Sequence, residues 1–272
     1  AYVKWRRDGW TKGKYLTPLL LLAALLAKEA GAAVVVLIVA YELFLTDSIK
    51  LRAPLASCLT FVLWLLYYKL SGYGVAHIGL YVDPAGTPLL FLKTMLVRIP
   101  VLLMGMWTGP AAELSIALGP IVGRYYLFAS FFVLFWLAFL FVPLLRHSTE
   151  AKFFAFTMLF SLIPSCATFP ADRLLFFAGI GGFGLLVLFL AGLIESHDWL
   201  PESRFWRLTA KVSAIILFVI HVVFAPLLFM FRTAFPFGPP EMAKFYVKVP
   251  EKTSLTGKKV IILNSPSVMH TM

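Results

Sequence analysis

The chain has 272 residues, of which 61% are hydrophobic and only 14% charged, and its formal net charge is +11 at pH 7. A soluble domain carries roughly a quarter charged residues, so this composition excludes an ordinary water-soluble protein and predicts helices that span a membrane. The positive charge lies in short clusters beside apolar runs, which is typical of membrane flanks and argues against nucleic-acid binding.

The first apolar stretch, residues 15–45, is too long for one upright helix. A single helix over it would be about 46 Å long, whereas the hydrocarbon core is about 30 Å thick. We predict two shorter helices joined by a turn at residues 28–31, although one tilted helix would also fit. Lys28 and Glu29 lie in this turn, where they either mark the headgroup level or serve a function.

Later apolar runs predict five further spans, at residues 53–70, 121–145, 153–167, 174–194 and 208–231. Residues 71–87 form an outer loop rich in Gly, Pro and aromatic residues, which is typical of functional connections. In residues 88–107, Lys93, Arg98 and Pro100 interrupt the apolar sequence, which predicts an interfacial helix. The expected fold is therefore an all-α polytopic membrane protein with about 7 transmembrane helices and one interfacial helix.

The positive-inside rule then orients the chain. Half of the 24 Lys and Arg residues fall in segments predicted to be cytoplasmic. If residues 88–107 crossed the membrane instead, residues 146–152 would move outside and the tail inside. The preferred arrangement places the tail on the outer side, and we expect a bacterial inner membrane. The cytoplasmic segments are residues 1–14, 46–52, 146–152 and 195–211.

The two ends of the sequence suggest a piece of a longer protein. The chain opens without an initiator Met on a charged segment that resembles a loop between spans. Residues 257–266, Gly-Lys-Lys-Val-Ile-Ile-Leu-Asn-Ser-Pro, predict one β-strand closed by a turn, and one strand cannot fold alone. We expect a basic flank at 1–14, a helical domain at 15–231, and a tail at 232–272 in which a soluble β-containing domain begins near Lys244.

One segment resembles a known family. Residues 19–34, Leu-Leu-Leu-Leu-Ala-Ala-Leu-Leu-Ala-Lys-Glu-Ala-Gly-Ala-Ala-Val, continue to Tyr41-Glu42-Leu43. This run resembles a segment of the membrane glycosyltransferases of the GT-C class, such as protein O-mannosyltransferases, with looser similarity through Asp83. The resemblance implies transfer of a sugar from a polyprenyl phosphate to an acceptor on the outer face. The family's catalytic acid lies on an earlier outer loop that has no counterpart here, so the catalytic residues stay unassigned.

Transfer from a lipid phosphate requires cationic groups that stabilise the phosphate leaving group. Lys28, Arg98 and Arg173 are the candidates for this role, and Arg173 also fits, with Asp172, an ordinary helix start.

The outer loop adds two candidates for substrate binding. Asp83, before Pro84, fits a metal ligand, an acceptor contact or a simple turn, and His77 fits either binding or a hydrogen bond within the loop. A divalent metal is therefore an open possibility, and no other cofactor is expected. With Glu29, these residues complete the predicted substrate-binding set.

Two other classes of function stay open. A non-catalytic membrane subunit of a larger complex fits the scarcity of polar residues within the spans. A transporter fits less well, because it would line its path with polar residues in several spans. The expected partners are membrane lipids, a polyprenyl-phosphate sugar and other membrane subunits. Cys58 and Cys166 lie far apart in apolar sequence, which predicts free thiols and gives no support to redox or zinc chemistry.

Overall fold

A computed structural model describes the chain except for residues 47, 49, 51, 74–80, 118 and 235–272. The chain divides into two compact units, Ala1–Val223 and Phe224–Met272. All regular structure in the described residues is helical, which confirms the all-α class. The strand predicted at residues 257–266 lies outside the described residues, as does the start of a β-containing domain near Lys244.

The first part of the chain forms a short N-terminal helix, α1 (Tyr2–Asp8), followed by α2 (Gly13–Ala27), α3 (Ala33–Phe44) and α4 (Leu55–Leu70). A 3-10 turn, η1 (Glu29–Ala32), joins α2 to α3. Lys28 is extended, with φ −162° and ψ 140°, so α2 ends where the sequence predicted a turn. Leu21, Leu25, Ala32 and Trp64 form a small core among these elements.

The longer part of the first unit begins with α5 (Pro88–Thr108), the short α6 (Leu114–Ala117) and α7 (Gly119–His147). It continues with α8 (Thr149–Ser165), the 3-10 turn η2 (Asp172–Leu174) and α9 (Phe176–Glu195). The last helices are α10 (Arg204–Phe218), a π-helical segment η3 (Val219–Phe224) and α11 (Ala225–Ala234), which belongs to the second unit.

Within the described residues, four helices are long and apolar enough to cross a membrane: Pro88–Thr108, Gly119–His147, Phe176–Glu195 and Arg204–Met230. Their outward surfaces have the same character. On α7, Phe128, Phe132 and Phe135 are each at least 74% exposed, which is a surface that water would not tolerate and lipid would. The fold is therefore all-α and membrane-like, as the composition predicted.

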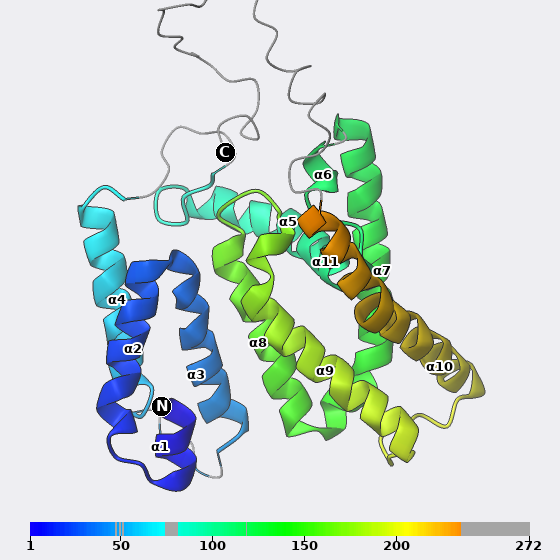
Figure 1. Ribbon diagram of the computed structural model, residues 1–272, viewed down its shortest axis with the longest axis horizontal. Coiled ribbons are helices and arrows are strands. Elements are labelled where there is room, and N and C mark those ends of the chain that lie inside the picture. The colour runs from blue at the N-terminus through cyan, green and yellow to red at the C-terminus, as the bar shows by residue number, and fades with distance from the viewer. Residues whose placement is uncertain (47, 49, 51, 74–80, 118, 235–272) are drawn as a thin grey trace, which may run out of the picture. The chain divides into compact units, whose positions relative to one another are not determined.

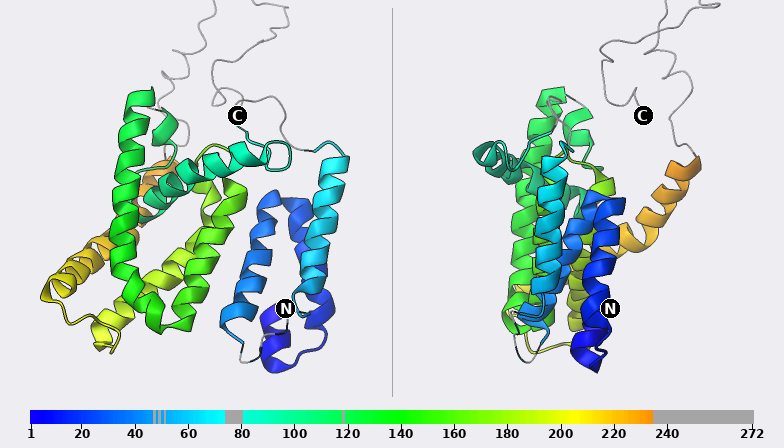
Figure 2. Two further views of the ribbon diagram at one scale, coloured as in Figure 1. Left: turned by 180° about the vertical axis from the view of Figure 1, so that it is seen from behind. Right: turned by 90° about the vertical axis from the view of Figure 1, so that its left-hand side faces the viewer.

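Helix α5 runs crosswise to α7 and α8 in all three views (Figures 1 and 2). Its length and composition would also let it cross a membrane. The sequence predicted an amphipathic interfacial helix here. In the first half, Leu89 and Leu96 are 75% and 72% exposed, and such apolar side chains suit lipid in either arrangement. The second half differs: Leu102 and Trp107 are almost fully buried in the main hydrophobic core. Apolar residues on every side of this half let it pack into the bundle.

The connections between helices separate into two groups at opposite ends of the first unit. The lower end in Figure 1 holds α1, the α3–α4 connection, the α7–α8 turn and the α9–α10 connection. These are the four segments that the sequence predicted to be cytoplasmic, and we call this the basic end. The opposite end holds the α2–α3 turn, the C-terminus of α4, α6 and the α8–α9 connection.

At the basic end, a buried ion pair between Arg6 and Glu42 connects α1 to α3. Glu42 is 1% exposed, and its carboxylate accepts hydrogen bonds from the Arg6 guanidinium and, at 2.7 Å, from the Tyr2 hydroxyl. The Tyr2 and Arg6 side chains thus satisfy a carboxylate that would be costly to bury alone.

Small residues bring α8 and α9 together. A Cβ atom at Gly181 would collide with the backbone of Phe154 and Met158, and one at Gly184 would collide with the Phe154 ring. Glycine therefore permits the close helix packing that membrane helices use in place of hydrophobic attraction.

Candidate functional site

The predicted site residues that the structure describes all lie in or next to connections of the end opposite the basic end. They fall into two neighbouring groups. One group surrounds the α2–α3 turn and the C-terminus of α4, and the other surrounds the α8–α9 connection. His77 lies outside the described residues.

The first group begins at the α2–α3 turn. Lys28 and Glu29 are both exposed, and the Tyr68 hydroxyl from α4 donates a hydrogen bond of 3.1 Å to Glu29 Oε1. Glu29 therefore links the turn to α4, while the Lys28 side chain lies at the surface beside it. This placement fits the headgroup level, because the polar groups sit at the helix ends and not halfway along them.

Asp83 forms an ion pair with Lys69, the last basic residue of α4. Lys69 Nζ lies 2.6 Å from Asp83 Oδ1, and the same oxygen accepts a 3.0 Å hydrogen bond from the Ala85 backbone N–H. The hydrogen bond from Lys69 holds the pKa of the Asp83 carboxyl below its ordinary value. Asp83 thus makes the turn expected of an Asp-Pro sequence and, in addition, a cross-link to α4.

The second group centres on the α8–α9 connection. Arg98 is half-buried, and its Nη1 donates a 2.8 Å hydrogen bond to the carbonyl of Cys166. The Val82 N–H donates a 2.9 Å hydrogen bond to the neighbouring carbonyl of Ala167. Both α5 and the turn before it are therefore tied to this connection, which places Asp83 and Arg98 in the same region.

Asp172 joins the α8–α9 connection to the segment after α5. Its Oδ1 accepts a 2.9 Å hydrogen bond from the Ala112 N–H, and its own N–H donates a 3.2 Å hydrogen bond to Glu113 Oε1. Glycine at position 105 allows this approach, because a Cβ there would lie 3.1 Å from Asp172 Oδ1. The next residue, Arg173, is exposed, and its guanidinium lies 5.6 Å from the centre of the Phe169 ring.

Glu113 is the residue that sequence analysis missed. Its Oε2 is buried and has no hydrogen-bond partner in the part of the chain that the structure describes. A carboxylate oxygen in that position is available to accept a proton or a hydrogen bond from a ligand. The only signal in the sequence was an acidic residue in a short segment between apolar helices. Many ordinary turns have the same feature.

The arrangement offers cations and carboxylates at one end of an apolar bundle. Lys28 and Arg173 have exposed side chains that could contact an anionic headgroup, and Arg98 is half-buried against the α8–α9 connection. Among the described residues, no group of three His, Cys, Asp or Glu side chains could hold a metal ion. Cys58 and Cys166 are both free thiols, as predicted.

Comparison of the chain with protein-family models, with curated proteins and with solved structures gives no significant match.

Proposed function

We propose that the protein binds a polyprenyl-phosphate sugar at the end opposite the basic end and transfers the sugar to an acceptor there. The observation that supports this proposal most is the collection of Lys28, Arg98 and Arg173 at that one end, together with the carboxylates of Glu113 and Asp172. In a bundle with few ionisable groups, such a collection is a candidate for substrate binding.

The proposed chemistry matches this placement. The polyprenyl chain would lie along the exposed apolar helix faces, with its phosphate at the level of the helix ends. As the bond between the sugar and the phosphate oxygen breaks, cationic side chains would stabilise the charge left on the phosphate. The acceptor oxygen forms the new bond to the sugar, and its proton passes to a carboxylate.

The proposal includes a topology of seven spans with α5 at the interface, which puts the site and the tail at residues 232–272 on the outer side. Several helices are short for this role, and α2 and α3 are the shortest of them. With 15 and 12 residues, α2 and α3 are about 22 and 18 Å long, whereas the hydrocarbon core is about 30 Å thick. A hairpin of this length would cross by thinning the bilayer locally, with η1 and α1 at its two surfaces.

A second candidate function is that of a non-catalytic membrane subunit. It is favoured by the structural roles that one cation of the proposed site, Arg98, and the nearby Lys69 already have within the chain. Lys69 pairs with Asp83, and Arg98 binds the Cys166 carbonyl, so both hold connections together. A structural subunit would need these contacts and would not need a substrate.

The two functions differ in their behaviour toward polyprenyl phosphate. The test uses the full chain in proteoliposomes with a photoreactive polyprenyl-phosphate sugar. We expect saturable labelling whose affinity falls about tenfold in Arg173→Gln and Lys28→Gln, because each variant removes a cationic donor to the phosphate. Lys93→Gln is the matched control, since Lys93 is exposed on α5 and lies outside the two groups. Labelling that is absent, or equal in all variants, would favour the subunit and contradict the transferase.

A further inference from the structure

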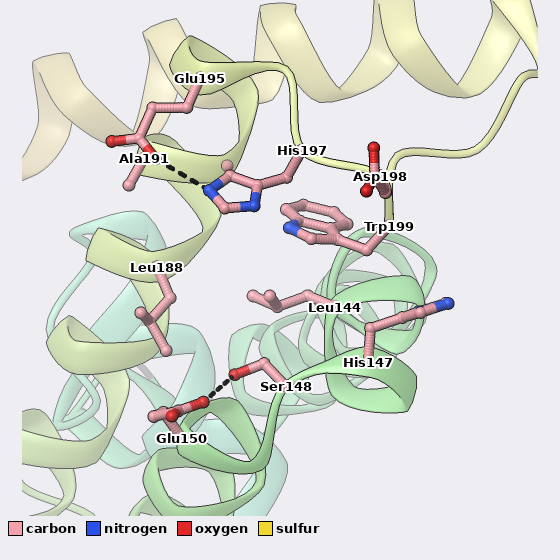
Figure 3. A pocket seen from close by; sticks show the side chains of 11 residues that line it. Leu144, His147, Ser148, Glu150, Leu188, Ala191, Glu195, His197, Asp198 and Trp199 are labelled. Atoms are coloured by element: carbon pink, nitrogen blue, oxygen red, sulfur yellow. Dashed lines mark hydrogen bonds and ion pairs between the residues drawn. The ribbon is translucent and has the colours of Figure 1, made fainter.

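A hollow of about 460 Å³ opens at the basic end, far along the helices from the proposed sugar-transfer site (Figure 3). It lies where the α7–α8 turn meets the end of α9 and the connection that follows α9. The size is in the range of small-ligand sites. Its floor is apolar, with Leu144 from α7 and Leu188 and Ala191 from α9.

The rim of the hollow is acidic. Of the 11 lining residues, Glu150, Glu195 and Asp198 carry carboxylates, and none is Lys or Arg. This is unusual for its location, because the neighbouring helix ends carry Arg146, Lys152 and Arg204. A ligand group that enters the hollow therefore meets negative charge within an end that is otherwise positive, which favours a cationic group over an anionic one.

Glu195 and Glu150 each have capacity left for a ligand. Glu195 Oε2 lies 2.8 Å from His197 Nε2, and Glu150 Oε2 accepts a 2.8 Å hydrogen bond from the Ser148 hydroxyl. A carboxylate has about four acceptor positions, so these contacts orient the groups without saturating them. Figure 3 shows the imidazole of His147 pointing away from Glu195 and Glu150, so of the two lining histidines His197 is the one that contacts a rim carboxylate.

Trp199 supplies an aromatic wall. Its indole packs so closely on α9 that a Cβ atom at Gly192 would lie 2.7 Å from Trp199 Nε1. Glycine at this position therefore permits the close approach of the ring to the helix. Trp199 is only 9% exposed, so its ring closes the side of the hollow, and the carboxylates are the groups that recognise an ammonium ion, through charge-assisted hydrogen bonds.

We propose that this hollow binds an ammonium group, and that its ligand is the ethanolamine headgroup of a membrane phospholipid. The hollow lies at the helix ends, where headgroups are found, and its apolar floor suits the carbon atoms of the headgroup and glycerol. Arg146 and Lys152 are exposed and flank the α7–α8 turn that lines the hollow. They are the cationic side chains that would bind the lipid phosphate. This proposal does not depend on the proposed sugar transfer.

The test measures lipid binding to the full chain in dodecyl maltoside by calorimetry. The probes are dihexanoyl-phosphatidylethanolamine, dihexanoyl-phosphatidylglycerol and free ethanolamine. We expect saturable binding of the phosphatidylethanolamine that weakens at least about tenfold in the double variant Glu195→Gln/Asp198→Asn, because it loses its charged acceptors. Glu202→Gln, an exposed carboxylate in the same connection that does not line the hollow, should bind like the natural chain.

A second variant keeps the rim carboxylates and fills the volume of the hollow. Ala191→Phe should fill the floor of the hollow and abolish lipid binding, with the thermal unfolding temperature as the check on folding. Equal binding of free ethanolamine would support the ammonium site and identify a soluble amine as its ligand. Binding of phosphatidylglycerol as strong as that of phosphatidylethanolamine, or binding unchanged in the double variant, would overturn the proposal.

Discussion

Lys69 and Asp83 form an ion pair, 2.6 Å from Nζ to Oδ1, that joins the C-terminus of α4 to the turn before α5. The pair fixes where the chain enters the crosswise helix. Because Val82, next to Asp83, also binds the Ala167 carbonyl, the turn is held from two sides. The position of α5 across the helix ends thus depends on a few polar contacts at the end opposite the basic end.

The Asp83 ion pair should make stability depend on pH in the acid range. The pKa of Asp83 lies below its ordinary value of 3.8, so the stabilisation is present at neutral pH and is lost as the pH falls through the lowered pKa. Asp83→Asn should lower the free energy of unfolding by less than about 1 kcal/mol at pH 7, because the pair is partly exposed. Denaturant unfolding in detergent at several pH values measures this difference.

Lys69→Gln serves as the partner variant. It should cause the same loss as Asp83→Asn, and the double variant should cause little more, because both changes remove one interaction. Losses that add in full would show that the ion pair does not stabilise the turn.

Loss of the buried Glu42 carboxylate should be far more harmful. Glu42→Ala leaves the Arg6 guanidinium without its ion-pair partner and should cost about 3–5 kcal/mol in the free energy of unfolding. Arg7→Gln is the control, because Arg7 has a side chain 71% exposed and should change stability by less than about 0.5 kcal/mol. A Glu42→Ala protein as stable as Arg7→Gln would contradict the role of the buried pair.

The packing of α8 on α9 should discriminate sharply between two glycines of the same helix. Gly181→Ala places a Cβ against the Phe154 and Met158 backbone and should cost about 1–3 kcal/mol through forced separation of the helices. At Gly179, a Cβ would meet only the Phe183 ring at 3.5 Å, so Gly179→Ala should be neutral or stabilising. Thermal unfolding of the two variants side by side checks this, and equal melting temperatures would argue against the close approach.

The helical fold could be predicted from the sequence because membrane helices leave strong local signals. The end of α2 at Ala27 followed from the length of the apolar stretch and the charges of Lys28 and Glu29. The spans at residues 121–145 and 174–194 correspond to α7 and α9, since uninterrupted apolar sequence has few alternatives in lipid.

The burial of the second half of α5 could not be predicted in the same way. Leu102 and Trp107 are apolar both in an interfacial helix and in a packed one, so their pattern does not say which neighbours cover them. Their burial depends on how α7 and α9 pack against α5, which the local sequence of α5 does not contain.

The polar contacts between connections also could not be predicted from the sequence. Asp83 and Arg98 were identified as candidates, but their partners, Lys69 and the Cys166 carbonyl, follow only from the three-dimensional arrangement. Glu113 gave no distinctive signal. Its Oε1 accepts a hydrogen bond from the Asp172 N–H and its Oε2 is buried without a partner among the described residues, and both facts depend on the three-dimensional arrangement. Polar contacts of this kind leave no periodic pattern or motif in the amino-acid sequence.

The crosswise position of α5 is the central structural claim, because it decides whether the connections that form the proposed site share one side of the membrane. Two single-cysteine variants, Ala85→Cys before α5 and Glu202→Cys after α9, test it in a background with Cys58 and Cys166 replaced by Ser. The measurement is labelling of intact spheroplasts with a membrane-impermeant maleimide. We predict that the cysteine at position 85 is labelled from outside, and that at position 202 only after permeabilisation. Labelling of both from the same side would mean that α5 crosses the membrane.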